Sequence, residues 1–575
     1  MHNNASKQTY LKSKTVFDNT TNFLYSSPCR IMSFQLVRKF RKERTKANYR
    51  EKDETMNNTI LTIPLKEHEK WWGGAVADGL NMPFANGQHA RDLLGNNKGN
   101  QCQPLLISNQ GRYVWSEDPI RYEFKDNQLT VSSSFGEILS GQAGGMLRDA
   151  FQHVSHTYFP STGTIPDPLF FTHPQYNTWI ELMYNQNEDD IVQYARNILD
   201  HGFPPGVLMI DDNWQTDYGT WEFAPGRFAD PKGMIDRLHA MGFKVMLWVC
   251  PFVSADSPVY RELRQKQSLI LESNGQTSMN ASGSATEPEP AIIRWWNGAS
   301  AVLDLTNPEA ERWFSRQLAR LVEVYGVDGF KLDAGDTPFY HGNLLSFQKV
   351  HANAHTERYA RIGLQYPFNE LRACWKLGGH PLVQRLRDKH CNWDDLRTLI
   401  PEILAQGLMG YAFTCPDMIG GGEYRSFLET ATVDQELVVR SAQCSALLPM
   451  MQFSVAPWRV LDSRHLEACK NVAALHAEAG PEILALAKES AKTGEPIVRH
   501  LEYVFPHQGY ADIKDQFMLG DSILVAPVLQ QGERRRIIRF PEGIWVGDDG
   551  SEIQGPDTIE IEAPLERLPW YRRKY

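Results

Sequence analysis

Residues 307–333 read "NPEAERWFSRQLARLVEVYGVDGFKLD", a stretch that predicts one long amphipathic helix followed directly by a buried strand. Pro308 and Gly326 mark the limits of the helix, because Pro is tolerated in the first turn of a helix and Gly is favoured just after its end. The strand "GFKL" then stops at the acidic Asp333. A strand that ends in a carboxylate is the unit on which our prediction of the fold depends.

The same order of strand and helix appears earlier in the chain. The sequence "GVLMID" at 206–211 is a short apolar strand, "DPKGMIDRLHAMG" at 230–242 is a helix, and "FKVMLWVCP" at 243–251 is a further buried strand. Because no Gly-rich phosphate-binding turn opens any of these helices, the repeats favour a (β/α)8 TIM barrel over a doubly wound sheet. We therefore predict an α/β catalytic barrel over residues 161–494, with the active site at the C-terminal ends of its strands.

Two β-rich regions flank the predicted barrel. Short alternating segments continue to Ser155 and predict an N-terminal β-sandwich over residues 58–160. Short segments of alternating apolar and polar residues return after Gly494, which predicts a small C-terminal all-β domain over residues 495–575. Residues 263–297 are rich in Ser, Asn, Glu and Pro and are interpreted as an insertion in a βα loop that shapes the pocket.

Composition restricts the partners and the location of the protein. The net charge of the whole chain is −10, and this total includes a basic and polar stretch in residues 1–57 that we interpret as a disordered or non-native leader, so the remainder of the chain is more acidic still. An acidic body argues against nucleic acid as a partner. The 8 Cys form no CxxC pair, which predicts neither a metal site nor a disulfide framework. No signal peptide or apolar spanning segment is seen, so we expect a cytoplasmic protein with no membrane partner. We also expect no cofactor. The sequence leaves open whether the protein is a homo-oligomer.

Several Asp residues stand where a predicted strand ends: Asp211, Asp212, Asp304, Asp333 and Asp417. Any one of them could merely cap the next helix. Their convergence on one barrel mouth, without His or Cys partners, is typical of glycoside chemistry, in which one carboxyl group protonates the leaving oxygen and another meets the developing oxocarbenium ion. A divalent metal is the alternative for clustered Asp, but it requires ligands at closer spacing than these.

Four ordered segments give the chain a specific resemblance. "GVDGFKLDAGD" at 326–336 resembles the nucleophile motif of glycoside hydrolase family 31, which implies that Asp333 is the nucleophile. "DKHCNW" at 388–393 is similar to the acid/base segment, in which the Asp precedes a Trp by five positions, and this spacing selects Asp388. Sixteen residues upstream of the acid/base the family has a substrate-binding Arg, a position held here by Arg372.

Two further segments carry substrate-binding candidates. Residues 210–248 resemble the family's preceding strands, which implies substrate contacts from Asp211 and from its neighbours in this region, Asp212 and Trp248. "RWWNGASAVLDLTNP" at 294–308 is similar to the family segment that places a Trp on the pocket wall, here Trp296. The likeness extends into "QFMLGDSILVAPVL" at 516–529, which resembles the start of the family's C-terminal β-domain.

Around the sugar pocket the sequence departs from the α-glucosidase pattern of the family. Lys331 and Arg385 stand where those enzymes have Trp, Gly421 replaces a Phe, and Ser454 is nearest to the place of a His. These departures resemble the branch of α-galactosidase type, and Asp417 belongs to one of the segments that carry this likeness. In that branch an axial 4-hydroxyl must be recognised, and Asp211, Asp212 and Lys331 offer charged partners for it. As an alternative, Lys331 serves only to lower the pKa of the nucleophile.

We therefore predict an exo-acting α-galactosidase that hydrolyses oligosaccharides or other glycosides by double displacement with retention of configuration. An α-xylosidase or α-glucosidase, a transglycosylase and an inactive sugar-binding subunit remain as alternatives. The mechanism expects a carboxyl separation of about 5–6 Å. Because Arg387 and Lys389 flank Asp388, desolvation or the neighbouring carboxylate must raise its pKa if it is to act as an acid near neutral pH.

Overall fold

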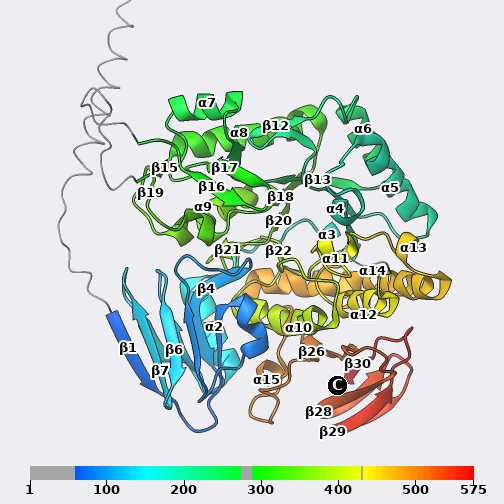
Figure 1. Ribbon diagram of the computed structural model, residues 1–575. Helices are drawn as coiled ribbons and strands as arrows, with labels where there is room; N and C mark the ends of the chain where they lie inside the picture. Colours follow the sequence, from blue (N-terminus) through cyan, green and yellow to red (C-terminus); the bar gives the residue numbers. More distant parts are fainter. Residues whose placement is uncertain (1–58, 274–287, 429–431) are drawn as a thin grey trace, which may run out of the picture. The chain divides into compact units, whose positions relative to one another are not determined.

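The computed structural model describes residues 59–273, 288–428 and 432–575 of the chain. All of them belong to one compact unit, Asn58–Tyr575. The leader that we predict over residues 1–57 lies outside the described residues. The domain boundaries within the unit stay predictions, because the barrel and the two β-rich regions pack together as one body (Figure 1).

The centre of the unit is a sheet of 8 parallel strands in chain order. The strands are β9 (Gln175–Asn177), β10 (Val207–Ile210), β13 (Lys244–Val249), β18 (Gly329–Leu332), β20 (Phe368–Leu371), β22 (Gln384–Arg385), β23 (Thr414–Cys415) and β24 (Gln452–Phe453). The last strand returns to pair with β9. Between β23 and β24 the backbone N–H of Ile419 donates to the carbonyl of Gln452 at 2.8 Å. The barrel is thus nearly closed, and the predicted fold class is confirmed.

The helices around the barrel begin and end at the residues that the sequence indicates. Helix α8 (Pro308–Tyr325) is capped by the side chain of Asn307, which accepts from the N–H of Glu309, and it ends at Gly326 with φ 79°. Helix α6 (Pro231–Ala240) is capped in the same way by Asp230. The other long helices of the barrel are α5 (Glu188–Asp200), α9 (Ala352–Ile362), α10 (Trp393–Leu408), α12 (Gln435–Ala446) and α14 (Ser463–Thr493).

One connection of the barrel has no helix in the described chain. Between β20 and β22 the chain forms strand β21 (Cys374–Trp375), which pairs with β4 (Gln101–Ser108) of the N-terminal region. The barrel wall is therefore joined to the N-terminal sheets through backbone hydrogen bonds. This junction brings the loop before β4 to the mouth of the barrel.

The N-terminal region contains two antiparallel sheets. One has the order β1 (Thr59–Pro64), β7 (Gln128–Ser133), β6 (Arg121–Lys125), β3 (His89–Asp92), and the other the order β2 (Trp71–Ala75), β4, β5 (Arg112–Trp115), β8 (Leu139–Gln142). The prediction of alternating segments as far as Ser155 is wrong for α2 (Leu147–Tyr158). Leu147, Phe151 and Val154 recur at helical spacing and are fully buried, so the apolar period there is that of a helix.

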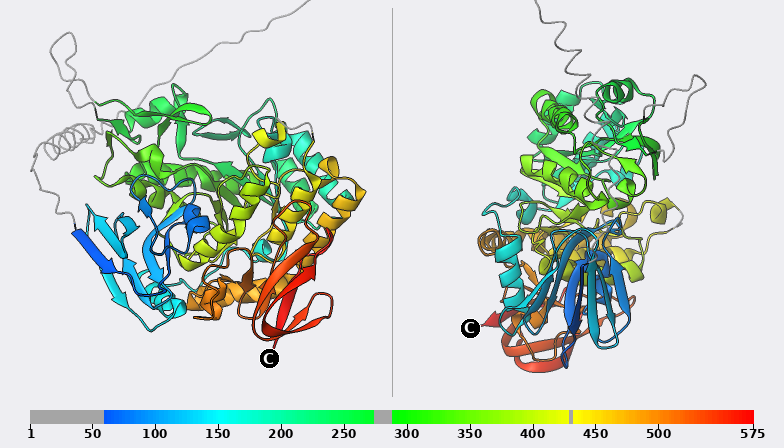
Figure 2. Two further views of the ribbon diagram at one scale, coloured as in Figure 1. Left: turned by 60° about the horizontal axis from the view of Figure 1, so that its bottom comes forward. Right: turned by 90° about the vertical axis from the view of Figure 1, so that its left-hand side faces the viewer.

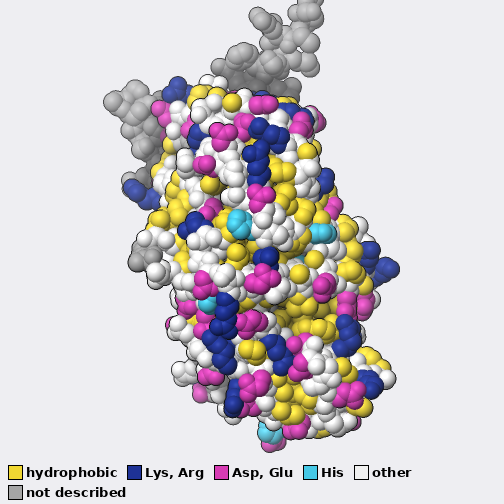
Figure 3. Space-filling model, turned by 90° about the vertical axis from the view of Figure 1, so that its right-hand side faces the viewer, with side chains coloured by type: hydrophobic (Ala, Val, Ile, Leu, Met, Phe, Trp, Pro, Cys, Tyr) yellow, Lys and Arg dark blue, Asp and Glu magenta, His cyan; other side chains and the backbone are white. Residues whose placement is uncertain are grey.

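The C-terminal region is a single antiparallel sheet of 6 strands. Its strands are β25 (Val498–Arg499), β26 (Phe517–Leu519), β27 (Ile523–Val525), β28 (Arg535–Gly547), β29 (Glu552–Glu562) and β30 (Trp570–Lys574). In both views of Figure 2 this sheet lies beside α14. On the face shown in Figure 3 basic and acidic side chains lie side by side rather than forming a continuous basic surface.

The predicted insertion at 263–297 carries structure where it is described. It contains the end of α7 (Pro258–Gln265), β15 (Leu271–Glu272) and β16 (Ile292–Trp295), whereas residues 274–287 lie outside the described residues. Strand β16 turns back into β17 (Gly298–Val302), which pairs with β14 (Phe252–Ser254). The turn between β16 and β17 carries Trp296 and Asn297 to the barrel mouth. Within the described ranges, no helix has both the length and the apolar character that a bilayer-spanning helix requires.

Candidate active site

A cavity of about 440 Å³ opens where the C-terminal ends of the barrel strands meet. Its volume lies in the range typical of small-molecule sites. Eight of the ten predicted site residues line it: Asp211, Asp212, Trp248, Trp296, Lys331, Asp333, Arg372 and Asp388. Of the five strand-end Asp residues predicted to converge on the barrel mouth, Asp211, Asp212 and Asp333 therefore do so, whereas Asp304 and Asp417 do not line the cavity.

Asp333 follows β18 directly and is held by two donors. Trp248 Nε1 donates to its Oδ2 at 3.0 Å, and Arg372 Nε donates to its Oδ1 at 3.0 Å. Burial raises the pKa of Asp333, but the positive charges of Arg372, Lys331 and Arg385 outweigh it and hold the pKa well below its usual range. Asp333 is thus an ionised carboxylate with a fixed orientation.

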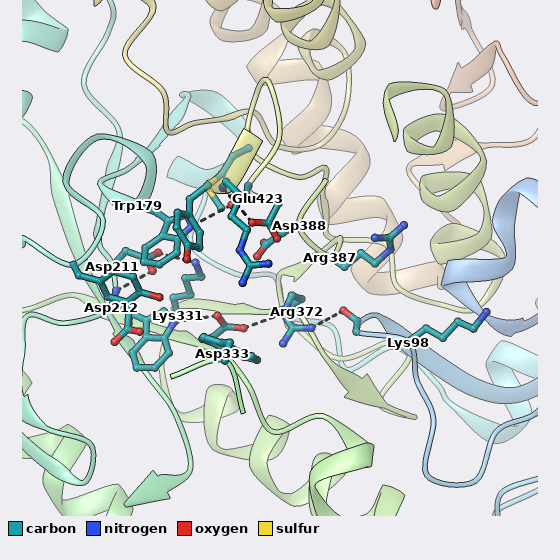
Figure 4. Close-up of a pocket in the computed structure, with 18 residues that line it drawn as sticks. Lys98, Trp179, Asp211, Asp212, Lys331, Asp333, Arg372, Arg387, Asp388 and Glu423 are labelled. Carbon is teal, nitrogen blue, oxygen red and sulfur yellow. Dashed lines mark hydrogen bonds and ion pairs between the residues drawn. The ribbon is translucent and has the colours of Figure 1, made fainter. Parts of the chain in front are cut away.

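Asp388 follows β22 and lies across the cavity from Asp333 (Figure 4). Its side chain is 42% exposed, against 11% for Asp333. Arg385 Nη1 donates to its Oδ1 at 2.8 Å. Burial raises the pKa of Asp388, but the guanidinium of Arg385 outweighs this effect and the pKa lies below its usual value. Asp388 is therefore ionised near neutral pH, opposite to the direction that the acid role requires.

Arg385 and Asp417 do not reach the cavity wall. Arg385 is 1% exposed and contacts three carboxylates, those of Asp388, Asp417 and Glu370, at 2.8, 2.8 and 3.2 Å. Burial raises the pKa of Asp417 to about 6 against the opposing charge of Arg385. Because both side chains lie behind Asp388, the structure does not place them to touch a substrate, contrary to the prediction for these two residues. They are placed instead to position Asp388.

A second group of charges faces the cavity from β10 and β18. Lys331 Nζ donates to Asp211 Oδ2 at 2.7 Å, and both side chains are almost fully buried. The neighbouring Asp212 accepts from the hydroxyl of Tyr218 at 3.2 Å and from Asn297. Burial, followed by the charge of Asp211, raises the pKa of Asp212 to about 7. This side of the cavity therefore offers both charged donors and charged acceptors.

The two predicted Trp residues occupy different positions. Trp248 is 1% exposed and its indole N–H is used by Asp333. Trp296 is 49% exposed, and the guanidinium of Arg372 lies 5.6 Å from the centre of its ring. Trp296 thus presents an open aromatic face at the rim, as expected for a ring that packs against a sugar.

Comparison with known proteins agrees with the fold and the cavity. Residues 173–475 match the model of the "Glycosyl hydrolases family 31 TIM-barrel domain", and residues 494–574 match the "Glycosyl hydrolase family 31 C-terminal domain". The chain belongs to glycosyl hydrolase family 31.

Among curated proteins, the family 31 chain is similar to "Myogenesis-regulating glycosidase" of Mus musculus, with 33% identity over 74% of this chain and 59% of that protein. It is also similar to "Alpha-xylosidase XylQ" of Lactiplantibacillus pentosus, with 26% identity over 80% of this chain and 60% of that protein. The chain therefore spans less than two thirds of the length of these relatives.

Solved structures share the fold at lower identity. A family 31 dextranase of Flavobacterium johnsoniae, complexed with glucose, superimposes with a TM-score of 0.77 at 19% identity, over 90% of this chain and 66% of that one. A family 31 α-xylosidase from a soil metagenome, complexed with xylose, gives a TM-score of 0.76 at 21% identity, over 90% and 79%.

The departures from the family 31 α-glucosidase pattern have structural reasons. Gly421 has φ 98°, and a Cβ there would lie 2.3 Å from the carbonyl oxygen of Lys389, so no Phe fits this backbone. Ser454 is buried away from the cavity, where its hydroxyl donates to the carbonyl of Asn177 and accepts from the N–H of Ile180. Neither residue lines the cavity.

Asp304 also lies away from the cavity in this family 31 chain. Its carboxylate accepts from the backbone N–H and the hydroxyl of Thr306 at the start of the turn before α8. Asp304 thus neither converges on the barrel mouth nor caps α8, whose cap is Asn307, and instead holds the turn before that helix. Over the described ranges, no group of three or more His, Cys, Asp and Glu side chains could hold a metal ion.

Several cavity residues were missed by sequence reasoning. Trp179, two residues after the end of β9, packs edge to face on Tyr424 at 5.5 Å and on Tyr184 at 5.4 Å, which completes an aromatic wall. The position of Trp179 just after a strand end was a usable signal. Lys98 and Arg387 also line the cavity, but no local pattern marks Lys98, because it comes from the N-terminal region.

Proposed function

We propose that the chain is a retaining, exo-acting α-glycosidase that releases terminal α-galactosyl groups. The observation that carries the proposal is the pair Asp333 and Asp388, which face each other across one cavity in different environments. Asp333 is buried and tied by two donors, whereas Asp388 is open to the cavity and tied by one. A fixed anion opposite a more accessible carboxyl group suits a nucleophile and an acid/base.

The proposed reaction has two displacements. In the first, Asp333 forms a bond to the anomeric carbon while the glycosidic bond breaks and Asp388 gives its proton to the departing oxygen. In the second, Asp388 takes a proton from water, the water oxygen bonds to the anomeric carbon, and the ester to Asp333 breaks. Two inversions leave the sugar in its original α configuration.

The proton of Asp388 has to be supplied by substrate binding or by mildly acidic pH. A sugar and its aglycone cover the exposed part of the Asp388 side chain, and lost hydration raises the pKa of a carboxyl group. The negative charge of Asp333 acts in the same direction. After the ester forms, that charge is gone and the pKa of Asp388 falls, which favours its role as a base in the second step.

Charged partners support the galactoside over the other sugars of this family. Lys331 and Asp211 form a buried pair at the cavity wall, and Asp212 lies beside them. Charge-assisted hydrogen bonds of this kind suit the hydroxyls of a pyranose, including an axial 4-hydroxyl. The names of relatives include an α-xylosidase and α-glucosidases, so xylose and glucose are the competing glycones.

A panel of nitrophenyl α-glycosides with galactosyl, glucosyl and xylosyl groups tests the proposal. We expect the highest kcat/KM for the galactoside and, by NMR, α-galactose as the first product. A higher value for the xyloside or glucoside would reassign the sugar, and a β product would contradict retention. Turnover of none of them would favour the inactive sugar-binding subunit, and transfer products at high acceptor concentration would favour a transglycosylase.

The same assay repeated in EDTA tests the absence of a metal requirement, and we expect unchanged rates. The cytoplasmic location stays a prediction that cell fractionation can check. Light scattering can establish the oligomeric state.

A further inference from the structure

The loop between β3 and β4 of the N-terminal region is fastened to both catalytic segments of the barrel. Arg372, the residue that holds Asp333, donates from Nη1 to the carbonyl of Gly99 at 2.9 Å. On the other side, the backbone N–H of Arg387, next to Asp388, donates to Asn100 Oδ1 at 2.6 Å. This loop is therefore a built part of the cavity wall.

Lys98 has an unusual backbone conformation in this loop. Its φ is 50°, in the left-handed region where Gly is favoured. Its side chain is exposed and lines the cavity. Among the residues that the structure describes, no carboxylate forms an ion pair with it. Its positive charge is therefore not compensated by an ion pair within the described part of the chain.

Arg387 is a second cation on the same side. It directly precedes the acid/base Asp388 and lines the cavity, and its side chain is only partly buried. Within the described ranges its guanidinium has no carboxylate partner either. This contrasts with Arg372 and Arg385, each of which contacts at least two carboxylates.

Figure 4 shows where these two cations lie relative to the sugar site. Both side chains extend beyond Arg372, away from Asp211 and Asp212. If the glycone lies against Asp211 and Asp212, the leaving oxygen faces Asp388 and the aglycone extends past Arg372. The acidic Glu423 lies near Trp179 rather than beside the two cations.

We propose that Lys98 and Arg387 form a leaving-group subsite for an aglycone that carries a negatively charged group, such as a carboxylate or a sulfate. The proposal rests on the proposed glycosidase function, because the direction of the aglycone follows from the role of Asp388. Two cations without protein partners at one side of a cavity favour an anion there through Coulomb attraction. An uncharged aglycone leaves both cations uncompensated.

Binding of an uncleavable matched pair tests this subsite. The two ligands are the S-linked α-galactoside of 4-mercaptobenzoic acid and the methyl ester of the same compound, with Kd measured by calorimetry on the whole protein. We expect the free acid to bind roughly 3- to 10-fold more tightly than the ester at low salt, a difference on the scale of partly exposed ion pairs. The preference should shrink with added salt.

The variants Lys98→Met, Arg387→Met and their combination identify the source of the preference. In the double variant both ligands should bind about as tightly as the ester binds to the unaltered protein. Lys125→Met, an exposed lysine on β6, is the matched control and should keep the preference. Circular dichroism spectra show that each variant is folded.

Two of the outcomes separate this proposal from the proposed function. If the ratio of the Kd of the free acid to the Kd of the ester is the same in the unaltered protein and in the double variant, the subsite is overturned. The same measurement is made with the S-linked glucosyl and xylosyl pairs. If only one of these binds and prefers the acid, the galactoside assignment fails while the subsite stands. If no pair binds, both proposals fail.

Discussion

Arg385 and Asp388 form a short hydrogen-bonded ion pair of 2.8 Å in which the arginine is 1% exposed and the carboxylate opens to the cavity. The arginine is held in turn by Asp417 and Glu370. The pair lowers the pKa of the group that, in the proposed mechanism, donates a proton to the leaving oxygen. An enzyme that uses this carboxyl group as an acid is therefore most active below neutral pH, where more of the group is protonated.

The first prediction concerns the pH profile of Arg385→Gln. Removing the guanidinium removes the effect that lowers the pKa of Asp388, so the protonated form persists to higher pH. We expect the alkaline limb of kcat/KM to move to higher pH with a substrate that has a poor leaving group. The control is a nitrophenyl glycoside, whose alkaline limb should move little because its leaving group needs no proton. If the alkaline limb of kcat/KM does not move with the poor leaving group, Arg385 does not set the pKa of Asp388.

The second prediction tests the nucleophile. Asp333→Gly should lower kcat by about 10⁴-fold or more, as with other enzymes that lose their nucleophile. Azide can occupy the space of the missing carboxylate and attack the anomeric carbon once. Azide should therefore restore turnover and give a glycosyl azide of the β configuration, identified by NMR. An α-glycosyl azide would mean that Asp333 is not the attacking group.

The third prediction tests the acid/base with the opposite stereochemical outcome. Asp388→Ala should lower turnover of substrates with poor leaving groups by about 10²- to 10⁴-fold and spare the first step with nitrophenyl substrates. Azide here attacks the glycosyl-enzyme and gives the α-glycosyl azide. Equal losses with both substrate types would contradict the acid role.

The fourth prediction concerns the buried pair of Lys331 and Asp211. Lys331→Met leaves the Asp211 carboxylate buried without its cation, which costs about 3–5 kcal/mol of unfolding free energy. The double variant Lys331→Met with Asp211→Asn should recover part of this loss, because the uncompensated charge is gone. Urea denaturation measures both. If Lys331→Met unfolds no more easily than the unaltered protein, the pair is not the buried ion pair described above.

Local sequence signals predicted strands β10, β13 and β18 and helices α6 and α8, because these segments carry residues that mark where each element starts or stops. Asn307, Pro308 and Gly326 define the helix before the nucleophile strand, and the structure places α8 between them. Helix α2 was missed because its apolar residues stand next to β segments of similar composition. There the helical period of Leu147, Phe151 and Val154 was the correct signal.

The site was predictable from strand ends for Asp211 and Asp333, and from the resemblance to the family's motifs for Arg372, Asp388 and Trp296. Asp211, Asp333 and Arg372 each come directly after a barrel strand, so a parallel barrel necessarily brings them together. Lys98 belongs to the N-terminal region and reaches the cavity only because β21 joins that region to the barrel wall. Arg385 was assigned to the substrate because nothing in the local sequence tells whether a side chain points into the cavity or behind Asp388.

The last prediction links strand pairing to the nucleophile through Gly329, the first residue of β18. A Cβ at Gly329 would lie 1.8 Å from the backbone carbonyl oxygen of Phe368, the residue that pairs with Gly329 between β18 and β20. Gly329→Ala therefore has to push the two strands apart, at a cost of about 1–3 kcal/mol in unfolding free energy. Because Asp333 follows the same strand, the displaced carboxylate should lower kcat by roughly 10²-fold. Gly226→Ala is the matched control, since its Cβ meets nothing within 4 Å. Denaturation and steady-state kinetics on the two variants check the prediction, and equal stability of both would show that β18 and β20 tolerate the extra methyl group.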